Sequence, residues 1–228
     1  MAISVLGSVA TQVRNNSSGT TITASHTLAA GANRIVVAWG AIEDDNAIAS
    51  ATYGGVAMTA LTEKSHSTGG TATRIRMFYL LNASLPADGA NNCVMTSTDA
   101  FLSGCWHVVC IQDAKQQAPE DTGNGESATN ATVDTGSTLT TITANAFIIS
   151  GFACNNNTSS STYGTGQSEL ADTASGASNS VTMVSSTETK VAAGADTQST
   201  TFAASNQENV AFAAAFEAIL DSNFFFFF

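Results

Sequence analysis

Apolar and polar residues alternate along several short stretches of this chain, which is the period of a β-strand with one buried face. Residues 20–28 show this alternation first. Two other runs, residues 34–42 and 146–154, are apolar at both odd and even positions, which predicts strands buried on both faces. Further strands are predicted at 73–81, 92–97, 104–111, 139–142, 181–184, 187–192 and 198–203, with two short strands around the Gly54-Gly55 turn within 50–59.

The last apolar segment, residues 210–220, fits two structures. Its alanine run, with Phe212 and Phe216 four residues apart, favours a helix by propensity. The alternation of Val210, Phe212, Ala214 and Phe216 favours a strand, and we choose the strand because it completes an all-β chain. The fold class predicted is an antiparallel β-sandwich of jelly-roll-like type.

The two halves of the chain resemble each other weakly. Residues 33–40 match 145–152, and Thr52-Tyr53-Gly54 matches Thr162-Tyr163-Gly164. This predicts a two-fold internal repeat with half-repeats at about 20–111 and 138–220, joined by a polar linker at 112–137. With 228 residues available, we expect one β-sandwich domain over 1–220, in which neither half need be stable alone.

The C-terminus carries five consecutive phenylalanines, Phe224, Phe225, Phe226, Phe227 and Phe228, after a polar hinge at 221–223. Burial of one Phe side chain stabilises a protein by roughly 1.5–3 kcal/mol, and an open apolar pentamer favours aggregation. We therefore expect residues 221–228 to form a docking tail. The sequence leaves open whether the tail docks in its own subunit, a sister subunit or another protein.

Charge limits the classes of partner. The net charge is −11 with only seven Lys and Arg residues, so no basic stripe exists to bind nucleic acid or anionic lipid. Only 11% of residues are charged, so Ser, Thr, Asn, Gly and Ala must form much of the surface. Residues 1–7 lack the basic and long apolar regions of a secretory signal peptide, and Glu217 and Asp221 interrupt the terminal apolar run, so we expect neither signal-directed export nor a membrane anchor.

Cysteine and histidine show no metal-binding spacing. The four cysteines, Cys93, Cys105, Cys110 and Cys154, lie in apolar runs and are expected to be small buried residues, with one disulfide left open. His107 lies in an apolar strand and is expected in the core. His26 and His66 lie in polar stretches and are expected at the surface.

Several segments together resemble a poorly characterised β-sandwich domain of phage structural proteins and bacterial surface proteins. These segments are His26-Thr27-Leu28 with 33–37, the Tyr-Gly-Gly stretch 51–59, 77–83 leading to Pro86, 108–111 and 211–219. The resemblance covers roughly residues 20–220 and implies a concanavalin-like or jelly-roll sandwich. It carries no agreed catalytic residues and does not extend to the Phe tail.

Two groups of residues are candidates for a ligand site. Glu43, Asp44 and Asp45 could supply oxygen ligands to Ca²⁺, although a solvated loop is the favoured interpretation. Tyr53 and Tyr163, each before a turn glycine, are candidate exposed aromatics, whereas Trp39 and Trp106 are expected in the core. No phosphate-binding loop is present, and the sequence does not show whether a base lies near any of the many Ser and Thr residues. We expect a non-enzymatic protein without a cofactor.

These observations favour a virion structural protein of a tailed phage, as a capsid decoration or cement protein or another exterior component. Such a protein is made in the host cytoplasm and needs no export signal. We expect it to form homo-oligomers and to contact sister subunits or other virion proteins through the tail. The alternative is an extracellular or cell-surface adhesin or carbohydrate-binding module.

Overall fold

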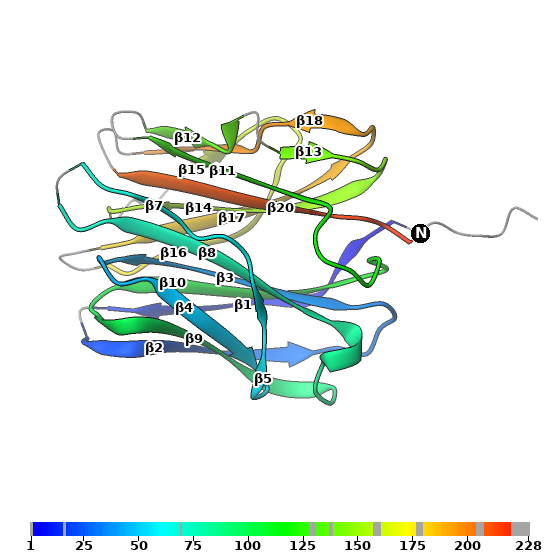
Figure 1. Cartoon of the computed structure of the whole chain (residues 1–228), viewed down its shortest axis with the longest axis horizontal. Coiled ribbons are helices and arrows are strands. Elements are labelled where there is room, and N and C mark those ends of the chain that lie inside the picture. Colours follow the sequence, from blue (N-terminus) through cyan, green and yellow to red (C-terminus); the bar gives the residue numbers. More distant parts are fainter. Residues whose placement is uncertain are drawn as a thin grey trace, which may run out of the picture.

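The computed structural model describes residues 2–15, 17–68, 70–127, 131–136, 139–156, 161–176, 180–203 and 208–219. Within these ranges the chain forms antiparallel strands, with one turn of 3-10 helix at Asn82–Ser84 (Figure 1). No helix in the described residues is long and apolar enough to cross a membrane. The all-β class predicted from the sequence is confirmed.

The first half of the chain forms a two-layer sandwich. Its inner sheet has the order β1-β10-β3-β8, with β6 and β7 beside β8, and its outer sheet has the order β2-β9-β4-β5. This is the strand order of a jelly roll. The strands are β1 Ser4–Arg14, β2 Gly19–Leu28, β3 Ile35–Glu43, β4 Ile48–Tyr53, β5 Val56–Ala57, β6 Thr59–Ala60, β7 Lys64–His66, β8 Thr73–Leu81, β9 Gly89–Phe101 and β10 Gly104–Gln112.

The second half repeats this plan. Its inner sheet has the order β11-β20-β14-β17-β16, and its outer layer consists of two small sheets, β12-β19-β15 and β13-β18. The strands are β11 Asp121–Ser127, β12 Thr132–Asp134, β13 Leu139–Thr141, β14 Ala146–Cys154, β15 Ser161–Tyr163, β16 Ser168–Ala174, β17 Thr182–Lys190, β18 Gly194–Asp196, β19 Ser199–Phe202 and β20 Asn209–Phe216.

The two inner sheets face each other, so the molecule has four β layers (Figure 1). The apolar side chains between the inner sheets form what we call the central layer. Both halves contribute to it, with Trp39 and Ile75 from the first and Ile149 and Phe212 from the second. Separate cores lie between each inner sheet and its own outer sheet. Each half-repeat therefore builds a sandwich of its own, and the central layer joins the two.

The repeat is visible in the backbone as well as in the sequence. The strands β3 and β14 occupy the same place in their sheets, as do β10 and β20. Asn33 and Asn145, which precede β3 and β14, both have left-handed backbone conformations, with φ of +49° and +61°. Trp39 and Gly151 are equivalent positions in the matched segments, and they meet across the central layer. A Cβ atom on Gly151 would lie 2.9 Å from Trp39 Cδ1, so only glycine leaves room for the indole.

Some strand predictions need correction. The segment 112–137, expected as a linker, contains β11 and β12, which belong to the second sandwich. The first sandwich begins with β1, before the half-repeat boundary expected at residue 20. β16 was not predicted. Residues 182–190 form one continuous strand, β17, where two strands were predicted at 181–184 and 187–192. The strand chosen for the last apolar segment is confirmed by β20.

Candidate functional site

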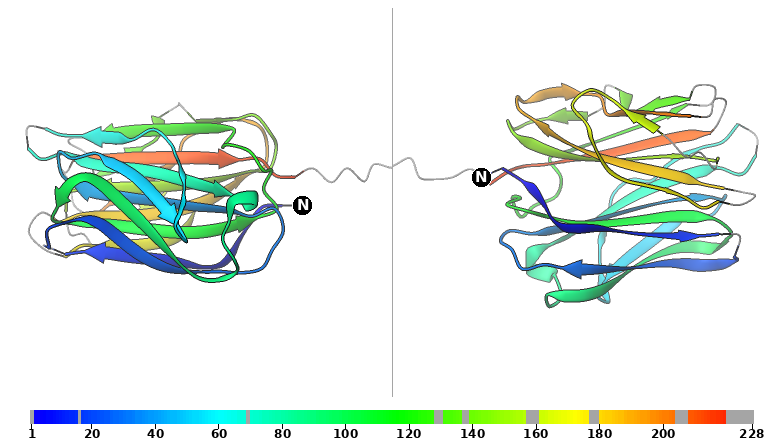
Figure 2. Two further views of the ribbon diagram at one scale, coloured as in Figure 1. Left: turned by 60° about the horizontal axis from the view of Figure 1, so that its bottom comes forward. Right: turned by 180° about the vertical axis from the view of Figure 1, so that it is seen from behind.

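The central layer has two ends with different character. At the terminal end, β3 and β14 begin, β20 finishes, and the described chain ends at Ile219. Figure 2 shows the start of β1 and the end of β20 together at this end in both views. At the opposite end, which we call the loop end, β3 and β14 finish and β8 and β20 begin. The acidic loop that follows β3 lies at the loop end.

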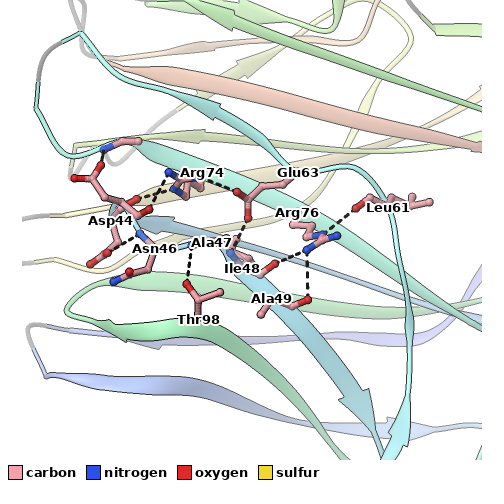
Figure 3. A network of polar contacts seen from close by, with 12 residues as sticks. Asp44, Asn46, Ala47, Ile48, Ala49, Leu61, Glu63, Arg74, Arg76 and Thr98 are labelled. Carbon is pink, nitrogen blue, oxygen red and sulfur yellow. Dashed lines mark hydrogen bonds and ion pairs between the residues drawn. The ribbon is translucent and has the colours of Figure 1, made fainter.

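At the loop end, two arginines on β8 hold neighbouring segments of the first sandwich, Arg74 the acidic loop and Arg76 the start of β4 and the segment after β6 (Figure 3). Arg74 donates hydrogen bonds to the carbonyl oxygens of Asp44 at 2.8 Å and Asp45 at 3.0 Å, and to Glu63 Oε1 at 2.8 Å. Arg76 donates to the carbonyl oxygens of Leu61 and Ile48. This cluster has a structural role, because each of these arginine donors binds a backbone or carboxylate oxygen of the same chain.

The three acidic residues of this loop do not converge on one point. Asp44 Oδ1 accepts from the Asn46 N–H and Asp45 Oδ1 from the Ala72 N–H, whereas Glu43 lies on the face of β3 that meets the central layer. Across the described ranges, no group of three Asp, Glu, His or Cys side chains is arranged to hold a metal ion. The Ca²⁺ loop considered from the sequence is therefore not formed by Glu43, Asp44 and Asp45 together.

The proposed exposed aromatics are not at the surface as a pair. Tyr53 is 0% exposed and its hydroxyl lies 2.8 Å from His26 Nδ1, so the expectation that Tyr53 is exposed was wrong. His26 is buried too, against expectation, and burial lowers its pKa. Tyr163 is half-buried and packs against the core of the second sandwich. Neither tyrosine was placed correctly by its position before a turn glycine, because that pattern does not show which face of the strand is covered.

The predicted core residues are confirmed. Trp39, Trp106 and His107 are all fully buried. All four cysteines are buried and free, and burial raises the pKa of each thiol to about 12, so none is a reactive thiolate. Both ring nitrogens of His107 are engaged across the central layer, Nδ1 with Ser185 Oγ at 3.1 Å and Nε2 with Thr173 Oγ1 at 2.7 Å.

An open hollow of about 450 Å³ lies where β1 turns into β2. Its lining includes Gln12, Arg14, Thr21 and Thr23. Arg14 donates hydrogen bonds to the carbonyl oxygens of Ser17 and Thr21 and stacks over Phe101 at 5.2 Å. The hollow offers polar contacts to a small ligand.

At the terminal end, the described chain is held until its last residue. Ala218 bridges to Ala114, and the Ile219 N–H donates to the Asp113 carbonyl oxygen at 3.1 Å. The two most exposed large apolar side chains of the described residues, Ile142 at 71% and Val191 at 75%, flank strands that end here. Phe224, Phe225, Phe226, Phe227 and Phe228 lie outside the described residues.

Comparisons with known proteins add little. The chain matches no protein-family model and no curated protein sequence. A solved structure titled "Red Clover Necrotic Mosaic Virus" aligns over 97% of this chain and 100% of the viral chain, with 9% sequence identity and a TM-score of 0.27. At that TM-score the likeness carries no argument about fold or function.

Proposed function

We propose that this protein is a non-enzymatic structural component on the exterior of a tailed-phage particle, in the role of a capsid decoration or cement protein. It attaches through its terminal end, with Phe224–Phe228 as the docking residues. The observation that carries this proposal is the position at which the described chain ends. The described chain ends at Ile219, at the same end as the exposed side chains of Ile142 and Val191. Exposed apolar side chains beside an apolar terminal segment are compatible with a protein–protein contact at this end.

The rest of the surface supports an exterior role. The outer sheet of the first sandwich carries Thr23, Ser25 and Thr27 at exposed positions, and the second outer layer carries Thr132 and Thr201. Uncharged hydroxyl side chains of this kind give solvated faces without strong binding to nucleic acid or lipid. The inner-sheet strands run from the attachment end to the loop end, so the loop end lies at the opposite end of the molecule.

The proposal includes a homo-oligomer. Interface hot spots are rich in buried aromatic side chains, and the five consecutive phenylalanines are proposed to supply them at the subunit contact. In a cyclic assembly, tails leaving the same end of every subunit meet near the symmetry axis. The partners proposed are therefore sister subunits and a neighbouring virion protein.

The test is deletion of residues 224–228, with oligomer mass measured by light scattering and attachment measured by co-sedimentation with particles that lack the protein. We expect the deletion to lower the oligomer mass and abolish attachment without changing Tm. A matched control, the double variant Ile142→Ser and Val191→Ser, keeps the tail and should weaken attachment only in part. If mass and attachment are unchanged while Tm falls, the tail belongs to the core of its own subunit and the docking proposal is wrong.

The alternative function is a cell-surface adhesin or carbohydrate-binding module. The observation that favours it is the polar hollow around Arg14. A glycan array in which the full chain binds one class of sugar, with binding lost in Arg14→Ala, would support this alternative over the virion proposal.

A further inference from the structure

Two carboxylates face the loop end of the central layer, one from each sandwich. Glu43 is the last residue of β3 and lies on the same face as Trp39 and Ala41, which point into the central layer. Glu208 directly precedes β20, in which Val210 and Phe212 point into the same layer. Because side chains alternate along a strand, Glu208 enters the central layer from the opposite side. The two acids are close enough for the charge of Glu208 to raise the pKa of Glu43, although burial is the larger cause and Asp44 adds a smaller one.

Hydrogen bonds hold Glu208 in place, but one of its two carboxylate oxygens has no hydrogen-bond partner among the described residues. Its side chain is buried, with only 6% of the residue exposed. Its Oε1 accepts hydrogen bonds from both the N–H and the Oγ1 of Thr68, each at 2.6 Å, and its own N–H donates to Asn155 Oδ1 at 3.0 Å. Its Oε2 has no hydrogen-bond partner among the described residues.

Thr73 adds a third oxygen. It is directly opposite Glu43 in the antiparallel pair of β3 and β8, so both side chains lie on the same face of the sheet. Thr73 is fully buried, and its Oγ1 has no hydrogen-bond partner in the described part of the chain; the same is true of Glu43 Oε2. Three buried oxygens without partners, two of them on acids, are costly unless something positive binds them.

Arg74 and Lys64 are engaged elsewhere, whereas His66, which pairs with Thr73 across β7 and β8, has a buried Nε2 without a hydrogen-bond partner among the described residues. Arg74 points its guanidinium at Glu63 and the loop carbonyls. Lys64 Nζ lies 2.7 Å from Glu126 Oε2, and His66 Nδ1 lies 3.5 Å from the same oxygen. No side-chain ion pair to Glu43 or Glu208 is found across the described residues.

We propose that Glu43, Glu208 and Thr73 bind a Ca²⁺ ion that joins the two sandwiches at the loop end. Ca²⁺ takes six to eight oxygen ligands in irregular geometry, and carboxylate and hydroxyl oxygens suit it. Glu43 is only partly buried, so water can complete the coordination shell. Two carboxylates are a small protein contribution, so the expected Kd is about 10⁻⁴–10⁻³ M, the range of extracellular modules. Mg²⁺ should bind less well, because it requires near-octahedral geometry. The inference stands independently of the virion proposal.

The test compares the full chain after EDTA treatment and dialysis with the same protein in Ca²⁺ at about 1–10 mM, which spans the expected Kd. We expect Tm to rise with Ca²⁺ concentration and to rise less with Mg²⁺, and calorimetric titration to show one site. Glu43→Gln should weaken Ca²⁺ binding by about tenfold or more and remove the Ca²⁺-dependent rise in Tm. Glu126→Gln is the matched control, because that carboxylate is paired with Lys64, and its Ca²⁺ response should equal that of the wild type.

Glu208→Gln tests the second ligand. If that variant does not fold, Glu43→Gln still decides the question, because Glu43 lies at the partly exposed rim of the layer. A wild-type Tm that is the same in EDTA and Ca²⁺ overturns the proposal, as does a Glu43→Gln variant that retains the full response. Stabilisation by mild acid without any response to Ca²⁺ would indicate a proton shared by the two carboxyls, and it would also overturn the metal site.

Discussion

His107 is the residue that most clearly couples charge to the packing of the two sandwiches. Burial lowers its pKa from 6.5 to about 3, and its two ring nitrogens hydrogen-bond to Ser185 and Thr173 of the second sandwich. The imidazole is therefore neutral in the folded protein. In the unfolded chain it takes up a proton below about pH 6.5. Between those two pKa values the unfolded state binds more protons, so stability falls as the pH falls.

We expect this residue alone to remove about 2 kcal/mol of stability between pH 8 and pH 5. In His107→Gln, which cannot be protonated, the free energy of unfolding should start lower at pH 8 and then lose less on acidification. Urea unfolding at a series of pH values measures the difference. Ser185→Ala serves as the control, because it removes one hydrogen bond without removing the titrating group, and its pH slope should match that of the wild type. Parallel curves for His107→Gln and the wild type would contradict the assignment.

At the scale of single elements, the turns before β3 and β14 share one backbone conformation and the same residue type. Asn33 and Asn145 both have left-handed backbone conformations, which cost an ordinary L-residue roughly 1–2 kcal/mol and which asparagine tolerates better. We expect Asn145→Ala to destabilise the protein by about 1–2 kcal/mol and Asn145→Gly to stay close to the wild type. Chemical denaturation of the two variants checks this. Equal losses for Ala and Gly would show that the side chain, and not the backbone conformation, matters at this turn.

The strands that sequence reasoning found and missed differ in how they are buried. β3, β14 and β20 are covered on both faces, so their apolar runs are unmistakable. β1 lies at a sheet edge with a mixed pattern of exposure, and β11, with the sequence DTGNGES, holds its place through backbone pairing to β20. An edge strand of this kind needs no apolar alternation, so its sequence resembles a linker. The meeting of Glu43 with Glu208 has no local signal either, since it depends on how two sandwiches stack.

At the scale of the whole molecule, the central layer makes the two sandwiches depend on each other. Their inner sheets bury Trp39, Ile75 and Met77 on one side and Ile149 and Phe212 on the other. If the halves were separated, each would expose a continuous apolar sheet face, which is an aggregation surface. The indole of Trp39 would also lose its close packing against the backbone of Gly151. Repeat units that cannot cover their own apolar faces are stable only when stacked.

We therefore expect the full chain to unfold in a single cooperative transition by scanning calorimetry, with equal calorimetric and van't Hoff enthalpies. Residues 1–118 and 119–228, expressed separately, should aggregate or remain unfolded, because neither covers its half of the central layer. When the two fragments are produced together, they should associate and recover the native Tm within a few degrees, which controls for damage caused by the cut itself. Two resolved transitions in the full chain, or a soluble and folded first fragment, would contradict this dependence. In that case the central layer would be a docking contact between independent domains, and the Glu43–Glu208 pair would lie at an interface able to open.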